Sequence, residues 1–302
     1  MNTRELLQQL KSGDRRALAR CISLVENEHP ESVEILQQLH IPGHSKIIGV
    51  TGPPGAGKST LVNSLLDHYN KQQPGCKIAV LAVDPTSPFT HGSLLGDRLR
   101  MSEHFNNPDI FIRSLATRGA LGGLSAKTIE ISDVLKAGGF DYIIIETVGV
   151  GQSEVEIAML ADTTLVVFVP ESGDEIQTIK SGIMEIADIF VVNKADREGA
   201  DRLMKNIQTT LHDRKFTGWQ VPVIKTVATA REGINELADS IKSHSDHPHS
   251  LKYRNEFLFS KALRLMQNKF INDLDINRLR DDLHDKSTDP GFNLYNFIYN
   301  WK

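Results

Sequence analysis

The chain has 302 residues, of which 40% are hydrophobic and 24% charged, and its formal net charge is −4. These values fit one large globular domain, or one domain with helical additions. Nothing in the charge indicates a nucleic-acid-binding or membrane-binding surface, and no apolar run approaches the roughly 18 residues that a membrane span needs. Cys21 and Cys76 match no metal or redox spacing, and the polar N-terminus has no apolar signal core, so we expect a cytoplasmic protein.

Residues 3 to 40 carry apolar side chains at three- and four-residue steps, which predicts helices. The dipeptides Gly13-Asp14 and His29-Pro30 interrupt this pattern. We therefore expect residues 1 to 43 to form an N-terminal helical extension, a hairpin that leans on the domain after it. Its role is either packing alone or contact with a partner or a second subunit.

Strands and helices alternate between about residues 44 and 245. Continuous apolar runs, typical of strands covered on both faces, predict strands at 47–50, 78–83, 110–112, 142–145, 164–169, 189–192 and 223–226. Helical patterns separate many of them, at 58–70, 125–137, 174–186, 199–213 and 233–242. This alternation predicts an α/β fold, a mostly parallel sheet with helices on both faces and ligands at the carboxyl ends of the strands.

The rest of the chain is expected to be a linker and a helical segment. Residues 244 to 250 contain three histidines and predict a solvated connector, with a metal site as the alternative. Helical spacing then returns, and residues 246 to 302 are expected to form a C-terminal dimerisation segment. The aromatic residues between Phe292 and Trp301 indicate docking, either on the chain's own core or on a second subunit.

A glycine-rich loop lies between the first expected strand and the first expected helix of the α/β region. It reads Gly52-Pro53-Pro54-Gly55-Ala56-Gly57-Lys58-Ser59, followed by Thr60, and fits the phosphate-loop pattern G-x-x-x-x-G-K-[ST]. The glycines allow backbone N–H groups to point at a phosphate chain, and the helix N-terminus favours negative charge. We expect Lys58 to reach the β- and γ-phosphates and Ser59 to ligate Mg²⁺.

A base-reading element follows a later strand as Asn193-Lys194-Ala195-Asp196. Guanine presents two adjacent donors that one carboxylate, here Asp196, can accept, whereas adenine has no such pair. Asn193 can tie this loop to the phosphate loop, and the Lys194 stem can cover the base. The sequence therefore predicts GTP or GDP as the bound nucleotide.

A second base contact is expected after the last core strand, at Val227, Ala228 and Thr229. GTPases often place Ser-Ala here and direct a backbone N–H at guanine O6. Val227 stands in the serine position, which a backbone contact tolerates.

The segment Glu146-Thr147-Val148-Gly149 resembles the D-x-x-G element of GTPases, with Glu in place of Asp. Glu146 could hold Mg²⁺ through water or orient the attacking water, and the Gly149 N–H could bind the γ-phosphate. A structural role for Glu146 is the alternative. Val150 occupies the position at which signalling GTPases carry a catalytic Gln, so we expect slow intrinsic hydrolysis.

Two further acidic residues, Asp84 and Asp97, could serve Mg²⁺ or a water, because hard cations prefer oxygen ligands. The alternative for each is a helix cap or a salt bridge. Arg98, Arg113 and Arg118 are candidate charge stabilisers, although for any one of them a plain ion pair is the simpler interpretation.

Together these motifs resemble those of the MeaB/ArgK-like GTPases, the G-protein chaperones of adenosylcobalamin-dependent methylmalonyl-CoA mutase. The nine residues from Glu146 to Glu154 are the most specific part of the match. The resemblance implies a P-loop, SIMIBI-like G domain in a homodimer that hydrolyses GTP. It also implies binding to an acyl-CoA mutase, gating of cofactor loading and protection of the mutase, and an extra switch at residues 170–180.

Two alternatives remain from different classes. One is a nickel-insertion metallochaperone GTPase, for which Cys21, Cys76 and the histidines of 244–249 would have to supply ligands. The other is an interaction protein in which nucleotide only orders the fold. Members of the family are also described as ATPases or kinases of a lysine/arginine/ornithine transport system, and the guanine-reading element argues against ATP.

Overall fold

The computed structural model describes residues 2–84, 101–116, 126–147, 153–171, 184–212, 218–247 and 275–287, together with single residues between 259 and 301. The chain divides into two compact units, Met1–Arg254 and Asn255–Lys302. None of the helices in the described ranges is long and apolar enough to span a membrane.

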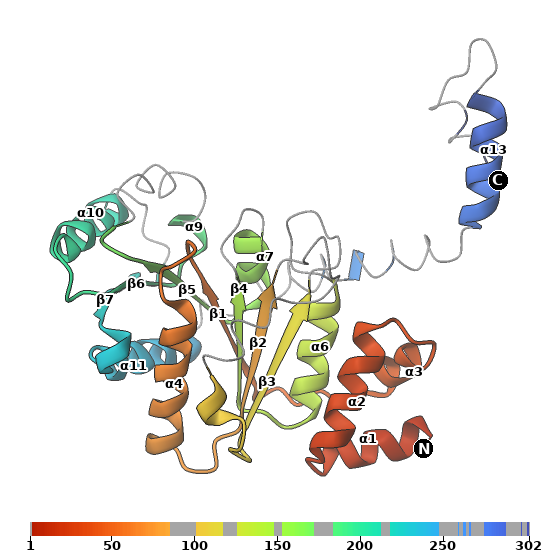
Figure 1. Cartoon of the computed structure of the whole chain (residues 1–302), viewed down its shortest axis with the longest axis horizontal. Coiled ribbons are helices and arrows are strands. Elements are labelled where there is room, and N and C mark those ends of the chain that lie inside the picture. The colour runs from red at the N-terminus through yellow and green to blue at the C-terminus, as the bar shows by residue number, and fades with distance from the viewer. Residues whose placement is uncertain are drawn as a thin grey trace. The chain divides into compact units, whose positions relative to one another are not determined.

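A seven-stranded parallel sheet forms the centre of the first unit (Figure 1), in the order β3-β2-β4-β1-β5-β6-β7. Its strands are β1 (Lys46–Thr51), β2 (Ile78–Asp84), β3 (Ile110–Ala116), β4 (Tyr142–Thr147), β5 (Thr163–Phe168), β6 (Ile189–Asn193) and β7 (Val223–Thr226). Strands β5 and β6 are buried along their whole length, which explains their unbroken apolar runs. All seven expected strands are present, and the α/β prediction is confirmed.

Helices cover both faces of the sheet. Helices α4 (Lys58–Gln72) and α11 (Ile234–Ser245) share one core with Ile48 and Val50 of β1, and α10 (Ala200–His212) packs on the other face against Phe168 and Phe190. Further elements are η1 (Ser102–His104), α6 (Ala126–Ala137), α9 (Met184–Ile186) and η4 (Ala228–Ala230).

Helix α7 (Ser153–Leu160) was not predicted from the sequence. It packs on β1, where the side chain of Ile157 fills the space beside Gly49. The helix expected at 174–186 lies outside the described residues except for α9.

Three helices, rather than a hairpin of two, form the N-terminus: α1 (Thr3–Lys11), α2 (Arg15–Glu26) and α3 (Glu31–Gln38). The third forms because Pro30 and the acidic turn after it start a new helix. Helix α2 packs on α6 and is held to the edge strand β3, where Arg113 pairs with Glu26 at 2.6 Å. Arg113 therefore makes the plain ion pair that was its simpler interpretation.

The prediction of a solvated connector at 244–250 is wrong for its first two residues. His244 and Ser245 belong to the last turn of α11, and His244 is only 1% exposed. Its Nδ1 lies 2.9 Å from the Thr163 hydroxyl, and its Nε2 lies 3.2 Å from a carboxylate oxygen of Asp188. These tertiary partners bury a polar segment that looks like a linker in the sequence.

The described part of the second unit contains α13 (Ile276–Ser287). The Trp301 indole N–H donates to the Asp282 carboxylate at 2.9 Å, and the Arg278 guanidinium lies 5.9 Å from the Trp301 ring centre. At least this aromatic residue of the tail therefore packs within its own unit.

Candidate functional site

The phosphate loop joins the end of β1 to the start of α4 (Figure 1), at the carboxyl edge of the sheet. Two of its glycines are required by close approach as well as by a positive φ. A Cβ on Gly52 (φ 139°) would meet the Val167 carbonyl oxygen at 2.2 Å, and a Cβ on Gly57 (φ 83°) would meet the Asn193 amide nitrogen at 2.5 Å. Glycine at both positions therefore lets the loop lie tightly between β5 and Asn193, the last residue of β6.

The Lys58 side chain folds back over this loop. Its Nζ donates to the carbonyl oxygens of Gly52 and Pro53 at 2.8 and 3.0 Å, and the residue is only 7% exposed. Pro54 and Gly55 are exposed, while Ala56 is buried and Thr60 half-buried in the first turn of α4. The Lys58 ammonium group therefore lies against the curled backbone of the phosphate loop.

Ser59, at the end of the loop, contacts Glu146 at the end of β4, 87 residues later in the chain. The Ser59 hydroxyl donates to a Glu146 carboxylate oxygen at 2.6 Å, and both residues are buried. Next to them, the Thr147 hydroxyl donates to the Thr51 hydroxyl at 3.0 Å and joins the ends of β4 and β1. A hydroxyl and a carboxylate oxygen form the kind of hard donor set that fits Mg²⁺.

Asn193 connects the phosphate loop to the segment after β7. Its side-chain amide donates to the Ala56 carbonyl at 2.9 Å. Its oxygen accepts from the Thr226 hydroxyl at 3.1 Å and from the Ala228 backbone N–H at 3.2 Å. Because Asn193 is 2% exposed, these bonds are shielded from water and fix two loops against each other.

The residues expected around the base lie in the segments after β6 and after β7, which Asn193 connects. Lys194 has a positive φ of 54°, and the next residue donates its backbone N–H to the Thr226 carbonyl at 3.0 Å. Asp196 and Thr229 are exposed, and Val227 is half-buried. The carboxylate of Asp196 is thus open to a ligand at this edge of the sheet.

Several predicted site residues lie outside the described residues. Asp84 ends β2, and its side chain lies outside the description. No part of Asp97, Gly149, Arg98 or Arg118 is described. Of the predicted extra switch, Pro170 and Glu171 are described, and Glu171 pairs with Arg197. The Arg197 guanidinium holds the pKa of the Glu171 carboxyl below its usual range.

The described residues contain no group of three His, Cys, Asp or Glu side chains that could hold a metal ion. In this part of the chain, His244 contacts Thr163 and Asp188, and Cys21 is buried. A nickel site built on these residues has no support from their geometry.

Sequence reasoning missed two residues of α4 that contact η4 and the residue after it. The Ser64 hydroxyl donates to the Ala228 carbonyl at 2.7 Å, and Asp67 pairs with Arg231. The available signal was their spacing on the helix that follows the phosphate loop, which by itself does not identify a partner.

Comparison with known proteins places these features in one family. The family model described as methylmalonyl Co-A mutase-associated GTPase MeaB matches residues 18–279. A Pyrococcus abyssi relative is 53% identical over 247 residues, which cover 80% of this chain and 76% of the relative. The GTPase ArgK of Escherichia coli is 38% identical over 247 residues, covering 78% of this chain and 74% of ArgK.

A solved structure shares the architecture over nearly the whole chain. It is described as an LAO/AO transport system kinase, is 27% identical, and superposes with a TM-score of 0.72 over 99% of this chain and 94% of its own. It has the P-loop NTPase fold expected for the seven-stranded parallel sheet described above. From the family match and these relatives, we conclude that the chain belongs to the MeaB family of methylmalonyl-CoA mutase-associated GTPases.

Proposed function

We propose that this protein binds and hydrolyses GTP with the help of Mg²⁺, and that it acts as a cytoplasmic chaperone of an adenosylcobalamin-dependent acyl-CoA mutase. The observation that carries the nucleotide part is the position of Asn193, which joins the phosphate loop at Ala56 to the segment at Ala228. A guanine nucleotide needs its phosphate and base contacts at a fixed separation, and this residue sets it.

Phosphate binding would rest on Lys58 and the loop N–H groups. The Lys58 ammonium is already positioned by two carbonyl groups, and it would exchange them for β- and γ-phosphate oxygens. The positive end of α4 adds to this field.

Ser59 and Glu146 would hold Mg²⁺, with Asp84 or Asp97 as further acidic groups. Bound Mg²⁺ neutralises charge on the β- and γ-phosphates during transfer. Catalysis would then consist mainly of positioning and electrostatic stabilisation. With Val150 in place of the glutamine of signalling GTPases, and Gly149 sensing the γ-phosphate, we expect a slow intrinsic rate that a partner can raise.

Base selection would rest on Asp196, which is exposed at the edge of the sheet and can accept both adjacent donors of guanine. Lys194 would cover the base with its stem, and the segment Val227–Thr229 would contact guanine O6 through a backbone N–H.

The mutase partner is supported by the family description. A homodimer is supported by three exposed apolar residues of the second unit, Phe259, Leu263 and Met266, which are 67%, 47% and 56% exposed. Each of the three is helical, and their spacing of four and three is typical of residues on one side of a helix.

The activity is tested by phosphate release from GTP, with and without methylmalonyl-CoA mutase and adenosylcobalamin. We expect slow release that the mutase accelerates, and loss of release in Lys58→Ala. The matched control is Lys71→Ala in the exposed last turn of the same helix, which should keep the wild-type rate. A wild-type rate that responds to no acyl-CoA mutase would contradict the chaperone role. If Lys58→Ala binds no GTP and still protects the mutase, nucleotide only orders the fold.

A further inference from the structure

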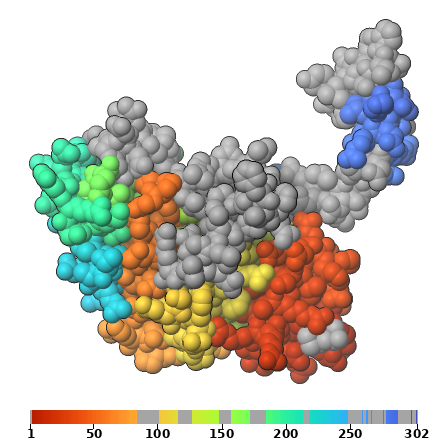
Figure 2. Space-filling model, viewed as in Figure 1, coloured from red at the N-terminus to blue at the C-terminus, as the bar shows by residue number. Residues whose placement is uncertain are grey.

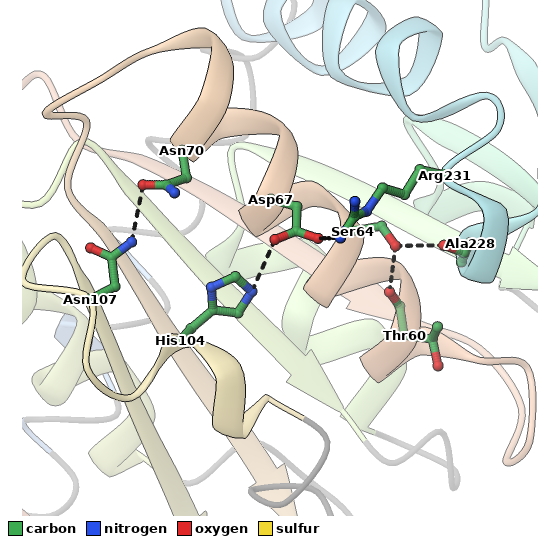
Figure 3. A network of polar contacts seen from close by, with 8 residues as sticks. All are labelled: Thr60, Ser64, Asp67, Asn70, His104, Asn107, Ala228 and Arg231. Atoms are coloured by element: carbon green, nitrogen blue, oxygen red, sulfur yellow. Dashed lines mark hydrogen bonds and ion pairs between the residues drawn. The ribbon is translucent and has the colours of Figure 1, made fainter.

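A line of polar side chains follows one side of α4 (Figure 3), the helix that begins at Lys58. It consists of Ser64, Asp67 and Asn70, whose three-residue spacing places them along one side of the helix. In Figure 2, α4 (orange) lies between α11 (cyan) and the segment around η1 (yellow), so this side of the helix has neighbours. Each of the three side chains contacts a residue of another element.

Ser64 is the buried member of this line and contacts η4. Its hydroxyl lies 2.7 Å from the Ala228 carbonyl oxygen and 3.0 Å from the carbonyl of Thr60, one turn earlier in its own helix. At 4% exposure it is shielded from water. The Ala228 backbone N–H donates to Asn193, the last residue of β6, and the Ala228 carbonyl accepts from Ser64 of α4, so η4 is held from both sides.

Asp67 holds the C-terminal end of η4. Its carboxylate pairs with Arg231, the residue that ends η4 with a positive φ of 60°. On its other side lies His104 of η1, with Nε2 at 3.6 Å from the carboxylate. Because a non-glycine residue rarely adopts a positive φ, Arg231 keeps this conformation only where its surroundings favour it.

Asn70 differs from the other two, because its partner lies away from η4. Its side-chain oxygen accepts from the Asn107 amide at 3.0 Å, in the segment before β3, and this contact is exposed (Figure 3). The line therefore has two members that hold η4 and one that does not.

We propose that Ser64 and Asp67 are positioning residues for guanine selection. They fix η4 to α4, the helix that begins at the end of the phosphate loop. The backbone N–H groups after β7 are then held at the distance from bound phosphates that a guanine base requires. This inference rests on the proposed function, because it assumes that the segment Val227–Thr229 contacts the base. Neither residue touches the nucleotide.

The test separates the base from the phosphates by comparing three ligands. Affinities of GTP, ATP and inorganic tripolyphosphate are measured by calorimetry with Mg²⁺ for wild type, Ser64→Ala and Asp67→Asn. Ser64→Ala should weaken GTP binding about fivefold, the size expected for one lost hydrogen bond. Asp67→Asn should weaken it about twofold, because Arg231 is half-exposed and such pairs contribute little. Tripolyphosphate and ATP affinities should stay unchanged in both variants, so the ratio of GTP affinity to ATP affinity should fall.

Two controls match the changes. Asn70→Ala alters the same side of α4 without touching η4, and Ser132→Ala removes a buried hydroxyl that donates only to the Ile129 carbonyl within its own helix. Both should keep the wild-type ratio of GTP to ATP affinity. Ser64→Ala preserves shape and favours the helix, and circular dichroism verifies the fold.

An unchanged GTP:ATP ratio in both Ser64→Ala and Asp67→Asn would overturn the inference. An equal loss of GTP and tripolyphosphate affinity would overturn it as well, because the damage would then lie in the phosphate loop. If wild type itself shows no preference for GTP, the proposed function fails and this inference fails with it. If wild type prefers GTP and both variants keep its GTP:ATP affinity ratio, this inference alone fails and the proposed function is unaffected.

Discussion

Asn193 is the side chain on which the proposed site depends most. Replacing it with Ala removes the bond to the Ala56 carbonyl and leaves the Thr226 hydroxyl and the Ala228 N–H without their acceptor. We expect Asn193→Ala to lower the free energy of unfolding by about 2 kcal/mol and GTP affinity by at least about tenfold.

Urea denaturation and GTP titration measure the two effects. Asn206→Ala, on the exposed side of α10, is the control and should change neither. A variant with wild-type GTP affinity would show that the tie between the two loops does not set the base position.

The two cysteines of the chain should be chemically inert in the native protein. Burial raises the pKa of the Cys21 thiol to about 11, and burial together with the neighbouring Asp141 raises the pKa of Cys76 to about 12. At pH 8 both thiols are therefore protonated, and only a thiolate reacts quickly. Iodoacetamide at pH 8 should modify neither until urea unfolds the protein, as read by mass spectrometry. Fast alkylation of native Cys76 would contradict this account.

Helix α11 depends on its last turn. His244 contacts Thr163 of β5 and Asp188, and its ring lies 4.8 Å from the Trp219 ring in an edge-on arrangement. His244→Ala should reduce the free energy of unfolding by about 3 kcal/mol, because packing is lost and Thr163 and Asp188 lose their polar partner.

The matched control is His212→Ala at the exposed end of α10, which should stay within about 0.5 kcal/mol of wild type. Both values come from urea unfolding curves. Equal stability of the two variants would mean that the end of α11 behaves as the solvated linker that the sequence suggests.

The elements show which structural features a sequence can predict. Strands β1 to β7 were all predicted, because both faces of a parallel sheet are buried and each strand is a compact apolar run. Helix α7 was missed because it is short and lacks a polar face in its sequence. The end of α11 was misjudged because His244 is buried by partners far away in the chain.

The same contrast holds within the site. The phosphate loop and the role of Asn193 as a tie were predictable, since glycines and an amide at those places follow local rules. The Ser59–Glu146 contact required knowing that β1 and β4 are neighbours. The contacts of Ser64 and Asp67 with η4 were not predictable, because they depend on how α4 packs against a loop more than 160 residues later.

For the whole molecule, the main prediction concerns self-association through the second unit. Replacing Phe259, Leu263 and Met266 with Ser removes an exposed apolar stripe, so a dimer that uses it should become a monomer. Light scattering after gel filtration measures the mass. Val33→Ser removes an apolar side chain that is 59% exposed on α3, and it should leave the mass unchanged. A dimeric triple variant would place the subunit contact elsewhere.

The account as a whole requires a guanine-selective nucleotide site. The most direct measurement is a pair of calorimetric titrations of the wild-type protein with GTP and with ATP, both in the presence of Mg²⁺. Because Asp196 can pair with both guanine donors and has no matching pair on adenine, GTP should bind at least about a hundredfold more tightly. Equal affinities for GTP and ATP would contradict the account.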